Sequence, residues 1–354
     1  MKSDFYLFFF YKLKGLGLNK IYELIKQFGS AQNLYQAKLD NKAGQIIQKY
    51  KNNKIWLDSI KQEFDGLTDQ YISIEDPDYP DLLKQIYDPP LFLFYKGNKK
   101  LLSSQYILTI VGSRKTTSYH RQTTTKLINQ LQGTPLVIAS GLAIGIDTFS
   151  HALALENKLA TIAVLASSLD KSKLYPQCNI KLAQDIINTN GLLISEYPSN
   201  TKTQLHHFPK RNRILAGLSK TVIVISGAKK SGTLITAQVA IDEGREVLAL
   251  PGNINQTLNQ GPNHLINKGA QILLSEDNIC KIYNLDNITN KTSNIKFSNS
   301  NTIKVYEILK LEPQTIEELV FRLKLTQEII NISISELELQ GLVNLNQLNQ
   351  IEII

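Results

Sequence analysis

The sequence predicts an α/β protein whose main domain is a doubly wound, mostly parallel Rossmann-like sheet. Two observations lead to this fold class. From Tyr106 onward, short apolar runs rich in β-branched residues alternate with helical segments, which is the pattern of parallel strands joined by crossover helices. Several of these runs end in glycine-containing loops that open the next helix. Ligands of such sheets bind outside the carboxyl ends of the strands, so we expect the functional site at that edge.

The individual elements follow from the same pattern, because a buried parallel strand reads as a short, nearly continuous apolar run. The expected strands are residues 107–111, 136–139, 161–165, 192–195, 221–225, 247–250 and 271–274. The expected helices are residues 120–131, 147–156, 179–189, 210–218, 233–243 and 264–268. A helix separates most consecutive strands, so the sheet is expected to be covered on both faces.

Four parts are expected along the 354 residues: a small N-terminal helical domain with a connector (1–95), the Rossmann-like domain (96–285), a linker (286–300) and a winged-helix-like domain (301–354). Residues 11–22 resemble a helix-hairpin-helix or SAM-like element, with Gly15 and Gly17 in the hairpin. A helical bundle element with a glycine turn fits the same residues equally well. The linker is rich in Asn, Ser and Thr, as linkers are.

The last part of the chain reads as three short helices followed by two small strands, at residues 302–311, 315–323, 326–341, 342–345 and 351–354. Its expected recognition helix, residues 327–339, contains Glu328, Glu336 and Glu338 and no Lys or Arg. An acidic helix face suits DNA poorly because the phosphates repel it. We therefore expect a protein-contact or regulatory module rather than a reader of duplex DNA.

The formal net charge of +8 is concentrated in two windows that contain no acidic residue. Residues 89–146 and residues 197–241 each contain seven Lys or Arg, so the rest of the chain sums to −6. This distribution is typical of a polyanion-binding protein, and a charge fluctuation on solvated faces is the alternative. Two cysteines are too few for a disulfide framework or a metal site. The apolar run at residues 5–11 is too short to span a membrane, so a cytoplasmic protein is expected.

The sharpest local signal is the glycine-bounded loop at residues 227–233, which follows an apolar run and opens the next helix. A strand feeding such a loop offers backbone N–H groups and the positive end of a helix dipole to an anion. The loop is close to a P-loop but lacks the Lys that contacts the terminal phosphates, so we expect no NTP hydrolysis. Lys210, Arg211 and Arg213 lie just upstream and favour phosphate binding over an ordinary turn with two solvated lysines.

Three loops are expected to meet at the carboxyl edge of the sheet: residues 112–114, 140–147 and 227–233. The helix that begins at Lys210 should bring its cations to the same edge. No dinucleotide fingerprint follows the first strand. No Ser-His-Asp or paired-carboxylate constellation stands out, so no cofactor, metal ligand or catalytic residue is expected. Asp147 is interpreted as a helix cap and His151 as a structural histidine.

Together these segments resemble the DNA-processing protein A family (DprA, also called Smf) over residues 75 to 280. The resemblance is carried by Ile110-Val-Gly-Ser-Arg114, Ser140-Gly-Leu-Ala-x-Gly-Ile-Asp147, Leu174-Tyr-Pro176, Ser195-Glu-Tyr-Pro198, Phe208-Pro-Lys-Arg-Asn-Arg213, Ala216-Gly-Leu-Ser219, Ser231-Gly-Thr-Leu-Ile-Thr-Ala237, Gly244-Arg-Glu-Val247 and Pro251-Gly252.

The resemblance implies a cytoplasmic, non-enzymatic protein that needs no cofactor and binds single-stranded DNA. It further implies a homodimer through the Rossmann-like domain that loads RecA recombinase onto incoming strands in natural transformation. The strand-binding residues that it implies are Gly112, Ser113, Arg114, Phe208, Lys210, Arg211, Arg213, Ser231, Gly232 and Thr233.

Three positions depart from the family pattern. Ile144 stands where the family usually has Arg, Ser226-Gly227 replaces an acidic residue, and Ser167-Ser168 replaces a pair of small residues. The alternative function is that of a Rossmann-like nucleotide-binding protein or nucleoside-phosphate hydrolase. Such a hydrolase needs an acid at the sheet edge, and Glu196 is the nearby candidate.

Overall fold

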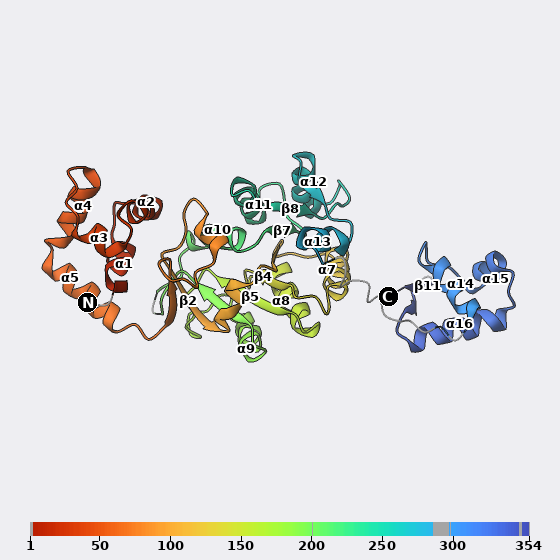
Figure 1. Cartoon of the computed structure of the whole chain (residues 1–354). Helices are drawn as coiled ribbons and strands as arrows, with labels where there is room; N and C mark the ends of the chain where they lie inside the picture. The colour runs from red at the N-terminus through yellow and green to blue at the C-terminus, as the bar shows by residue number, and fades with distance from the viewer. Residues whose placement is uncertain (1–2, 200, 286–296, 298, 347–348, 354) are drawn as a thin grey trace. The chain divides into compact units, whose positions relative to one another are not determined.

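The computed structural model of the chain describes residues 3–199, 201–285, 297, 299–346 and 349–353. The chain divides into two compact units, residues 1–289 and 290–354 (Figure 1). The first unit contains a nine-stranded sheet with its helices, and the second has a hydrophobic core of its own.

The sheet has the strand order β1-β2-β6-β5-β4-β3-β7-β8-β9. Neighbouring strands are parallel throughout the run β6-β5-β4-β3-β7-β8-β9. Strand β2 runs antiparallel to both of its neighbours, β1 and β6. The chain fills the sheet outward from β3 to β6 and then returns to the other side of β3 with β7. The mostly parallel, doubly wound, Rossmann-like sheet is therefore confirmed. The strands are β1 (Gln70–Ser73), β2 (Phe92–Gly97), β3 (Ile107–Val111), β4 (Val137–Ser140), β5 (Ala160–Leu165), β6 (Leu192–Ser195), β7 (Thr221–Val224), β8 (Glu246–Ala249) and β9 (Gln271–Ile272).

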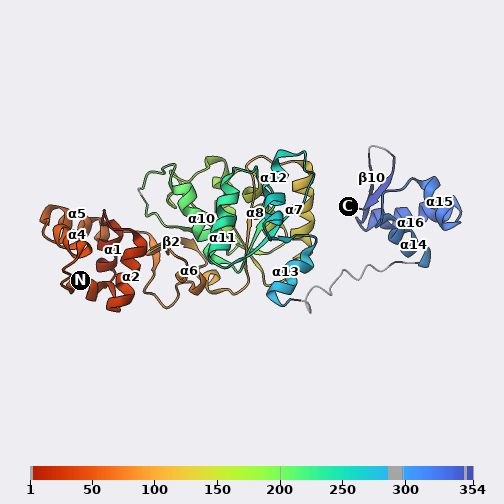
Figure 2. The same ribbon diagram turned by 90° about the horizontal axis from the view of Figure 1, so that it is seen from above.

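Helices cover both faces of the sheet because successive side chains of each strand point to opposite sides. In β3, Ile107 and Val111 belong to one core, whereas Leu108 and Ile110 belong to the other. The first core receives buried residues from α9 (Ile180–Asn188), α10 (His207–Leu218), α11 (Gly232–Asp242) and α12 (Gln260–Asn267). The second receives them from α7 (Ser118–Gln130), α8 (Ile146–Glu156) and α13 (Glu276–Tyr283). Helices α10 and α11 lie side by side (Figure 2).

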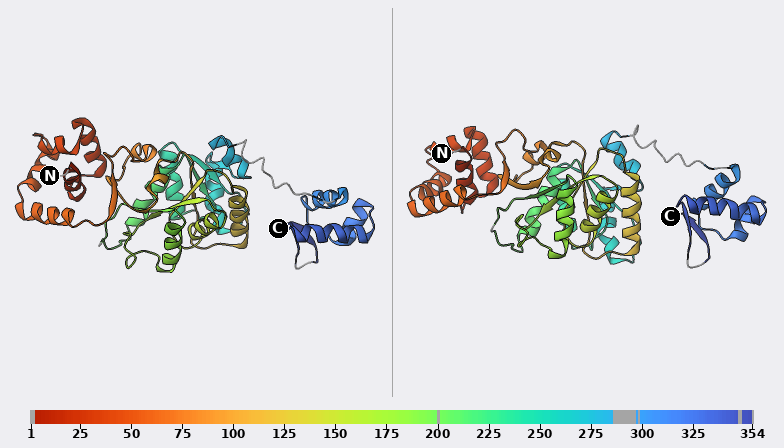
Figure 3. Two further views of the ribbon diagram at one scale, coloured as in Figure 1. Left: turned by 60° about the horizontal axis from the view of Figure 1, so that its bottom comes forward. Right: turned by 90° about the horizontal axis from the view of Figure 1, so that it is seen from below.

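Helices α1 to α5 precede the sheet. They gather into one bundle, drawn red to orange in Figure 3. The bundle starts with α1 (Ser3–Lys12) and α2 (Leu18–Phe28), which the expected hairpin joins. Gly15 adopts a φ of +90° there, a conformation that favours glycine, and Gly17 occupies the N-cap of α2. The remaining helices are α3 (Ala31–Gln36), α4 (Lys42–Lys51) and α5 (Lys54–Asp65), and α6 (Asp81–Lys84) lies in the connector.

The structure differs from the sequence-based division at residue 95, which falls inside β2. The sheet already begins at Gln70 with β1, and β2 pairs with β6, so the connector is part of the Rossmann-like unit. Nor is the helical bundle separate, because its aromatic residues share one core with the sheet. The Phe92 ring on β2 contacts those of Phe8 and Tyr11 on α1, at centroid distances of 6.0 Å and 5.7 Å.

The second unit contains the expected three helices and two strands. They are α14 (Ser300–Leu309), α15 (Ile316–Leu323), α16 (Gln327–Leu339), β10 (Val343–Leu345) and β11 (Ile351–Ile353), and the two strands pair antiparallel. The expected linker, 286–300, lies mostly outside the described residues. Within the described ranges, the helices are too short or too polar to cross a bilayer.

The aromatic contact between α1 and β2 predicts strong coupling of the bundle to the sheet. Phe92→Ala removes a fully buried ring and should lower the free energy of unfolding by about 3–5 kcal/mol, measured by urea denaturation. Ile55→Ala removes a side chain that is 85% exposed and serves as the control. If both substitutions lowered the free energy of unfolding by similarly small amounts, the bundle and the sheet would not share a core.

Candidate nucleic-acid interface

The carboxyl ends of β3 and β7 adjoin at the point where the winding of the sheet reverses. β3 pairs in parallel with β4 on one side and with β7 on the other. Ligands of doubly wound sheets bind in the crevice at such a switch point. A groove of about 570 Å³ lies there, and we call it the edge groove. Eight residues expected at the site line it: Gly112, Ser113, Arg114, Phe208, Arg211, Ser231, Gly232 and Thr233.

Backbone hydrogen bonds fix the loop after β3 to its neighbours. The Ser113 N–H donates to Ser226 Oγ after β7 (3.0 Å), and the Ile146 N–H at the start of α8 donates to Ser113 O (3.2 Å). A Cβ at Gly112 would lie 2.5 Å from the Ile146 side chain, so only glycine allows this close approach. Ser226, noted from the sequence only as a departure from the family pattern, thus accepts a hydrogen bond that holds two loops together. Arg114 remains exposed at the rim.

The loop after β7 presents the N-terminus of α11 to the edge groove. The Gly227 N–H donates to Leu258 O (2.7 Å) and Gly227 O accepts from the Gly261 N–H (2.8 Å), so the start of the loop is anchored. Ser231 occupies the N-cap but makes no capping hydrogen bond with its side chain. The first N–H groups of α11 therefore lack a side-chain acceptor, a combination that favours a bound anion. Lys229 and Lys230 are exposed in the same loop.

The first turn of α10 contributes an aromatic ring to the edge groove. The guanidinium carbon of Arg114 lies 5.7 Å from the centroid of the Phe208 ring. The Tyr175 ring meets the same ring edge-on, with a centroid distance of 5.4 Å and an interplanar angle of 76°. Tyr175 was part of the Leu-Tyr-Pro segment of the resemblance, but no site role was predicted for it. The pairing of Tyr175 with Phe208 is a tertiary contact without a signal in the local sequence.

Arg211 is buried beneath the edge groove, and its hydrogen bonds connect α10 to the carboxyl ends of β4 and β5. Its Nη1 donates to Gly141 O after β4 (2.6 Å) and to Val164 O on β5 (2.5 Å). A Cβ at Gly141 would lie 2.2 Å from this Nη1, so glycine makes room for the guanidinium. Among the described residues none accepts a hydrogen bond from Nη2, which leaves a donor for a bound ligand.

Asp147 lies close enough to Arg211 for the two buried charges to stabilise one another. Burial raises the pKa of the Asp147 carboxyl, and the Arg211 charge opposes this increase. Burial likewise lowers the pKa of Arg211, against the field of Asp147. Asp147 Oδ2 accepts a hydrogen bond from the Gly141 N–H (3.2 Å), so this carboxylate supports the loop between β4 and α8.

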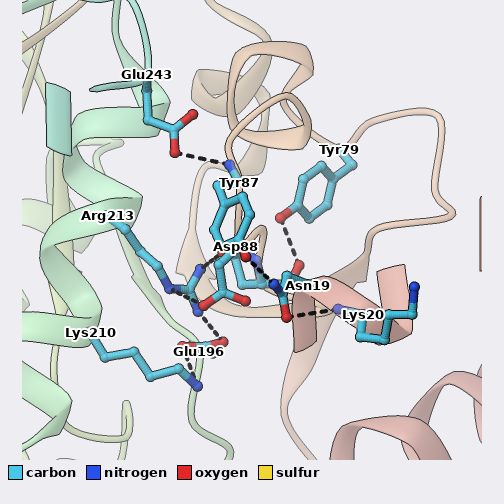
Figure 4. Close-up of polar contacts among 10 residues, drawn as sticks. Asn19, Lys20, Tyr79, Tyr87, Asp88, Glu196, Lys210, Arg213 and Glu243 are labelled. Carbon is cyan, nitrogen blue, oxygen red and sulfur yellow. Dashed lines mark hydrogen bonds and ion pairs between the residues drawn. The ribbon is translucent and has the colours of Figure 1, made fainter. Parts of the chain in front are cut away.

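Lys210 and Arg213 lie on the opposite side of α10, which corrects the expectation that Lys210 shares an edge with Arg114. Positions 208, 211 and 212 of the helix face the edge groove, whereas 210 and 213 face Glu196 and Asp88 (Figure 4). Arg213 Nη2 lies 2.5 Å from Glu196 Oε1 and Arg213 Nε lies 3.2 Å from Asp88 Oδ2. Lys210 Nζ lies 3.4 Å from Glu196 Oε2.

This cluster of four charged residues, Asp88, Glu196, Lys210 and Arg213, is a structural ion-pair network. Burial disfavours the charged form of Arg213, but Glu196 and Asp88 raise its pKa. Glu196 is only 1% exposed, and it lies outside the lining of the edge groove. Glu196 is the acid that a nucleoside-phosphate hydrolase would need, and it is already paired with Arg213 and Lys210. Lys210 instead lines a second groove, of about 380 Å³, beside the hairpin between α1 and α2.

His151 is a core residue, as interpreted from the sequence. It is fully buried on α8, and its Nδ1 lies 2.7 Å from Thr161 Oγ1. Burial lowers the pKa of His151 to about 3, so the imidazole is neutral at physiological pH. The described residues contain no group of three or more metal-binding side chains.

Comparisons with known proteins agree with this architecture. A family model described as DNA recombination-mediator protein A matches residues 70–284. The chain is 45% identical to the DNA processing protein DprA of Bacillus subtilis over 208 residues, which cover 59% of this chain and 69% of that protein.

Two solved structures are also similar. The crystal structure of DprA from Streptococcus pneumoniae matches 78% of this chain and 97% of its own, with 36% identity and a TM-score of 0.66. A structure of DNA processing protein A from Helicobacter pylori, described by its single-stranded DNA binding mode, matches 62% of this chain and 98% of its own. Its identity is 33% and its TM-score 0.55.

The opposite sides of α10 predict different outcomes for two arginine substitutions. Arg213→Met leaves Glu196 buried with a single, more distant cation, so the free energy of unfolding should fall by about 3–5 kcal/mol. Arg114→Met removes an exposed charge and should change it by less than about 0.5 kcal/mol. Urea denaturation of both variants measures the difference. Equal effects would contradict the assignment of Arg213 to the structural network.

Proposed function

The chain belongs to the DNA recombination-mediator protein A family, and from this premise we propose that it binds single-stranded DNA in the edge groove. The observation that carries the proposal is the convergence of the α11 N-terminus, Arg114 and Phe208 on one groove at the switch point. The helix N-terminus and the arginine suit a phosphate, and the aromatic ring suits a base. The Helicobacter pylori relative, described by its single-stranded DNA binding, supports the same ligand.

Preference for a single strand over a duplex follows from the kind of contacts available. A single strand can turn its bases toward an aromatic side chain, whereas a duplex keeps them stacked inside. Duplex readers usually insert a helix with basic or amide side chains into the major groove. Helix α16 has Glu328, Glu336 and Glu338 and no Lys or Arg, so it is a poor candidate for that role.

The further roles rest on family membership alone. We place the chain in the cytoplasm as a homodimer, joined through its Rossmann-like domain, that protects incoming strands and hands them to RecA recombinase. Within this scheme the edge groove is a binding site without chemistry of its own. The loop at residues 227–233 lacks the lysine with which a P-loop contacts the terminal phosphates of a nucleotide, directly before its Ser or Thr. This difference supports a role that needs no ATP.

The proposal is tested by fluorescence anisotropy with a labelled dT20 strand and a 20-base-pair duplex at about 150 mM salt. We expect the single strand to bind at least about tenfold more tightly than the duplex. The stacking energy of one base on an aromatic side chain corresponds to about a tenfold change in affinity. Equal affinities at this salt concentration would contradict the proposal.

The placement of the cations predicts which of them contact phosphates. Arg114→Ala should flatten the slope of log K against log salt by roughly 0.7, the value for one neutralised phosphate of a single strand. Lys210→Ala should leave the slope almost unchanged, because Lys210 is paired with Glu196 on the other side of α10. A salt titration of dT20 binding measures both slopes, and Arg114→Lys, which keeps the charge, is the control. If Lys210→Ala flattened the slope and Arg114→Ala left it unchanged, the strand would lie on the Lys210 side of α10 instead.

A further inference from the structure

The second groove, on the Lys210 side of α10, has the features of a binding site of its own, and we call it the hairpin groove. Its volume is about 380 Å³, and among the described residues it shares no lining residue with the edge groove. The hairpin and the start of α2 supply an apolar wall. The connector, the segment after β6 and α10 supply polar side chains. The residues on which the argument depends are Leu13, Leu16, Leu18, Asp88, Tyr197 and Lys210.

The clearest sign of a missing ligand is the hydroxyl group of Tyr197. This side chain is only 8% exposed, and its Oη has no hydrogen-bond partner among the described residues. The ring is held in place by stacking on His207, with a centroid distance of 3.8 Å and an interplanar angle of 13°. The hydroxyl of Tyr11 differs, because it donates to Glu196 O (3.0 Å). A buried polar group without a partner is costly, so a ligand that accepts from Tyr197 would remove this cost.

The hydroxyl of Tyr197 acts as a donor at every physiological pH. Burial raises the pKa of Tyr197, and the charge of Glu196 raises it further. The group therefore stays protonated beside the hairpin groove, and its proton suits an acceptor such as a carboxylate oxygen.

The N-terminus of α2 adds backbone donors to the hairpin groove. Gly17 occupies the N-cap and has no side chain with which to cap the helix. The Ile21 N–H donates to Gly17 O (3.0 Å), and the Lys20 N–H donates to Asn19 Oδ1 (2.8 Å). The N–H groups of Leu18 and Asn19 have no acceptor in the described part of the chain. Free N–H groups at the positive end of a helix dipole favour an anion.

The charges beside the hairpin groove decide which kind of anion fits. Two acids, Asp88 and Glu196, and two bases, Lys210 and Arg213, form the ion-pair network, so its formal charges cancel (Figure 4). Arg213 contacts both carboxylates, whereas Lys210 contacts Glu196 at the longer distance of 3.4 Å, and its side chain is 34% exposed. A run of phosphates would meet the two acids and gain little. A single carboxylate finds one cation, one hydroxyl and one helix N-terminus.

The apolar wall requires that the ligand carry more than a carboxylate. Leu13 is buried, and Leu16 and Leu18 are half-buried in the same wall. A volume of about 380 Å³ lies within the usual range of ligand-sized clefts, about 300–1,000 Å³. The last residues of a polypeptide combine a carboxylate with apolar side chains on an extended backbone. Capture of a C-terminal carboxylate by free backbone N–H groups is a recurring mode of peptide recognition.

We propose that the hairpin groove binds the C-terminus of a partner protein whose last residue is apolar. The terminal carboxylate lies between Lys210 Nζ, the Tyr197 hydroxyl and the start of α2, and the last side chain packs on the leucines of the hairpin. The hairpin groove and the edge groove lie on opposite sides of α10. A partner protein and a DNA strand can therefore be bound at the same time.

The test uses fluorescence anisotropy with a fluorescein-labelled hexapeptide, Gly-Ser-Gly-Ser-Leu-Phe, that ends either in a free carboxylate or in a carboxamide. The full-length protein should bind the carboxylate form about tenfold more tightly, because only this form makes charge-assisted hydrogen bonds. Tyr197→Phe keeps the stacked ring and removes the hydroxyl, so it should weaken binding of the carboxylate form about fivefold. Lys210→Met should weaken it about tenfold. Both variants should bind dT20 as the parent does.

The matched control is Lys20→Met, which removes an exposed charge of α2 that is paired with Glu23 (2.9 Å) and lies outside the lining of the hairpin groove. It should leave peptide binding unchanged, and thermal melting establishes that each variant is folded. Saturating dT20 should leave the peptide bound. N-acetylphenylalanine should displace the peptide only at roughly tenfold or higher excess over the peptide's own effective concentration, since it lacks the preceding residues.

Four results would overturn the proposal. The first is absence of binding, or equal binding, of the two peptide forms, and the second is an equal loss in Lys20→Met and Lys210→Met. Displacement of the peptide by dT20 would show that the hairpin groove takes the DNA strand instead. Displacement by N-acetylphenylalanine at the same concentration as by unlabelled peptide would make it a site for small carboxylic acids. The proposed function of the edge groove is measured separately by dT20 binding and is untouched by all four.

Discussion

The buried guanidinium of Arg211 is the interaction on which the geometry of the site depends. It joins α10 to the carboxyl ends of β4 and β5 through two carbonyl oxygens, those of Gly141 and Val164. Once this position of the helix is fixed, the helical period of 3.6 residues decides where its neighbours point. Phe208 and Asn212 then face the edge groove, and Lys210 and Arg213 face away from it. The dense cationic segment is thereby divided into a side that lines the edge groove and a side that is held in ion pairs.

Each side of α10 satisfies a different physical requirement. On the groove side, charges must remain available to a ligand, and Arg114 is exposed at its rim. On the other side, Glu196 is almost completely buried and therefore needs cationic partners, which Arg213 and Lys210 supply. Asn212 links the two neighbouring helices, because its Nδ2 donates to Gly232 O at the start of α11 (3.3 Å). The position of the α11 N-terminus thus depends on the same helix that carries Phe208.

Much of the fold could be predicted from the sequence, because the parallel strands are short apolar runs with helices between them. The predicted bounds of β3 and β6 coincide with the observed ones. Strands β1 and β2 were missed because they pair antiparallel and precede the regular alternation of strands and helices that begins at Tyr106. The convergence of the glycine loops could be predicted from the topology of such sheets. The orientation of Lys210 and Arg213 could not, since it depends on Glu196 and Asp88, whose proximity only the folded chain reveals.

The central claim is that a single strand crosses the Phe208 side of α10, between the loop after β3 and the start of α11. Photo-crosslinking measures this directly. A dT20 strand containing 4-thiothymidine is irradiated with the full-length protein, and mass spectrometry locates the modified side chains. The account predicts cross-links at Tyr175, Phe208 and residues 112–115. Cross-links confined to the hairpin at residues 13–17 and Lys210, or to residues 299–353, would contradict it.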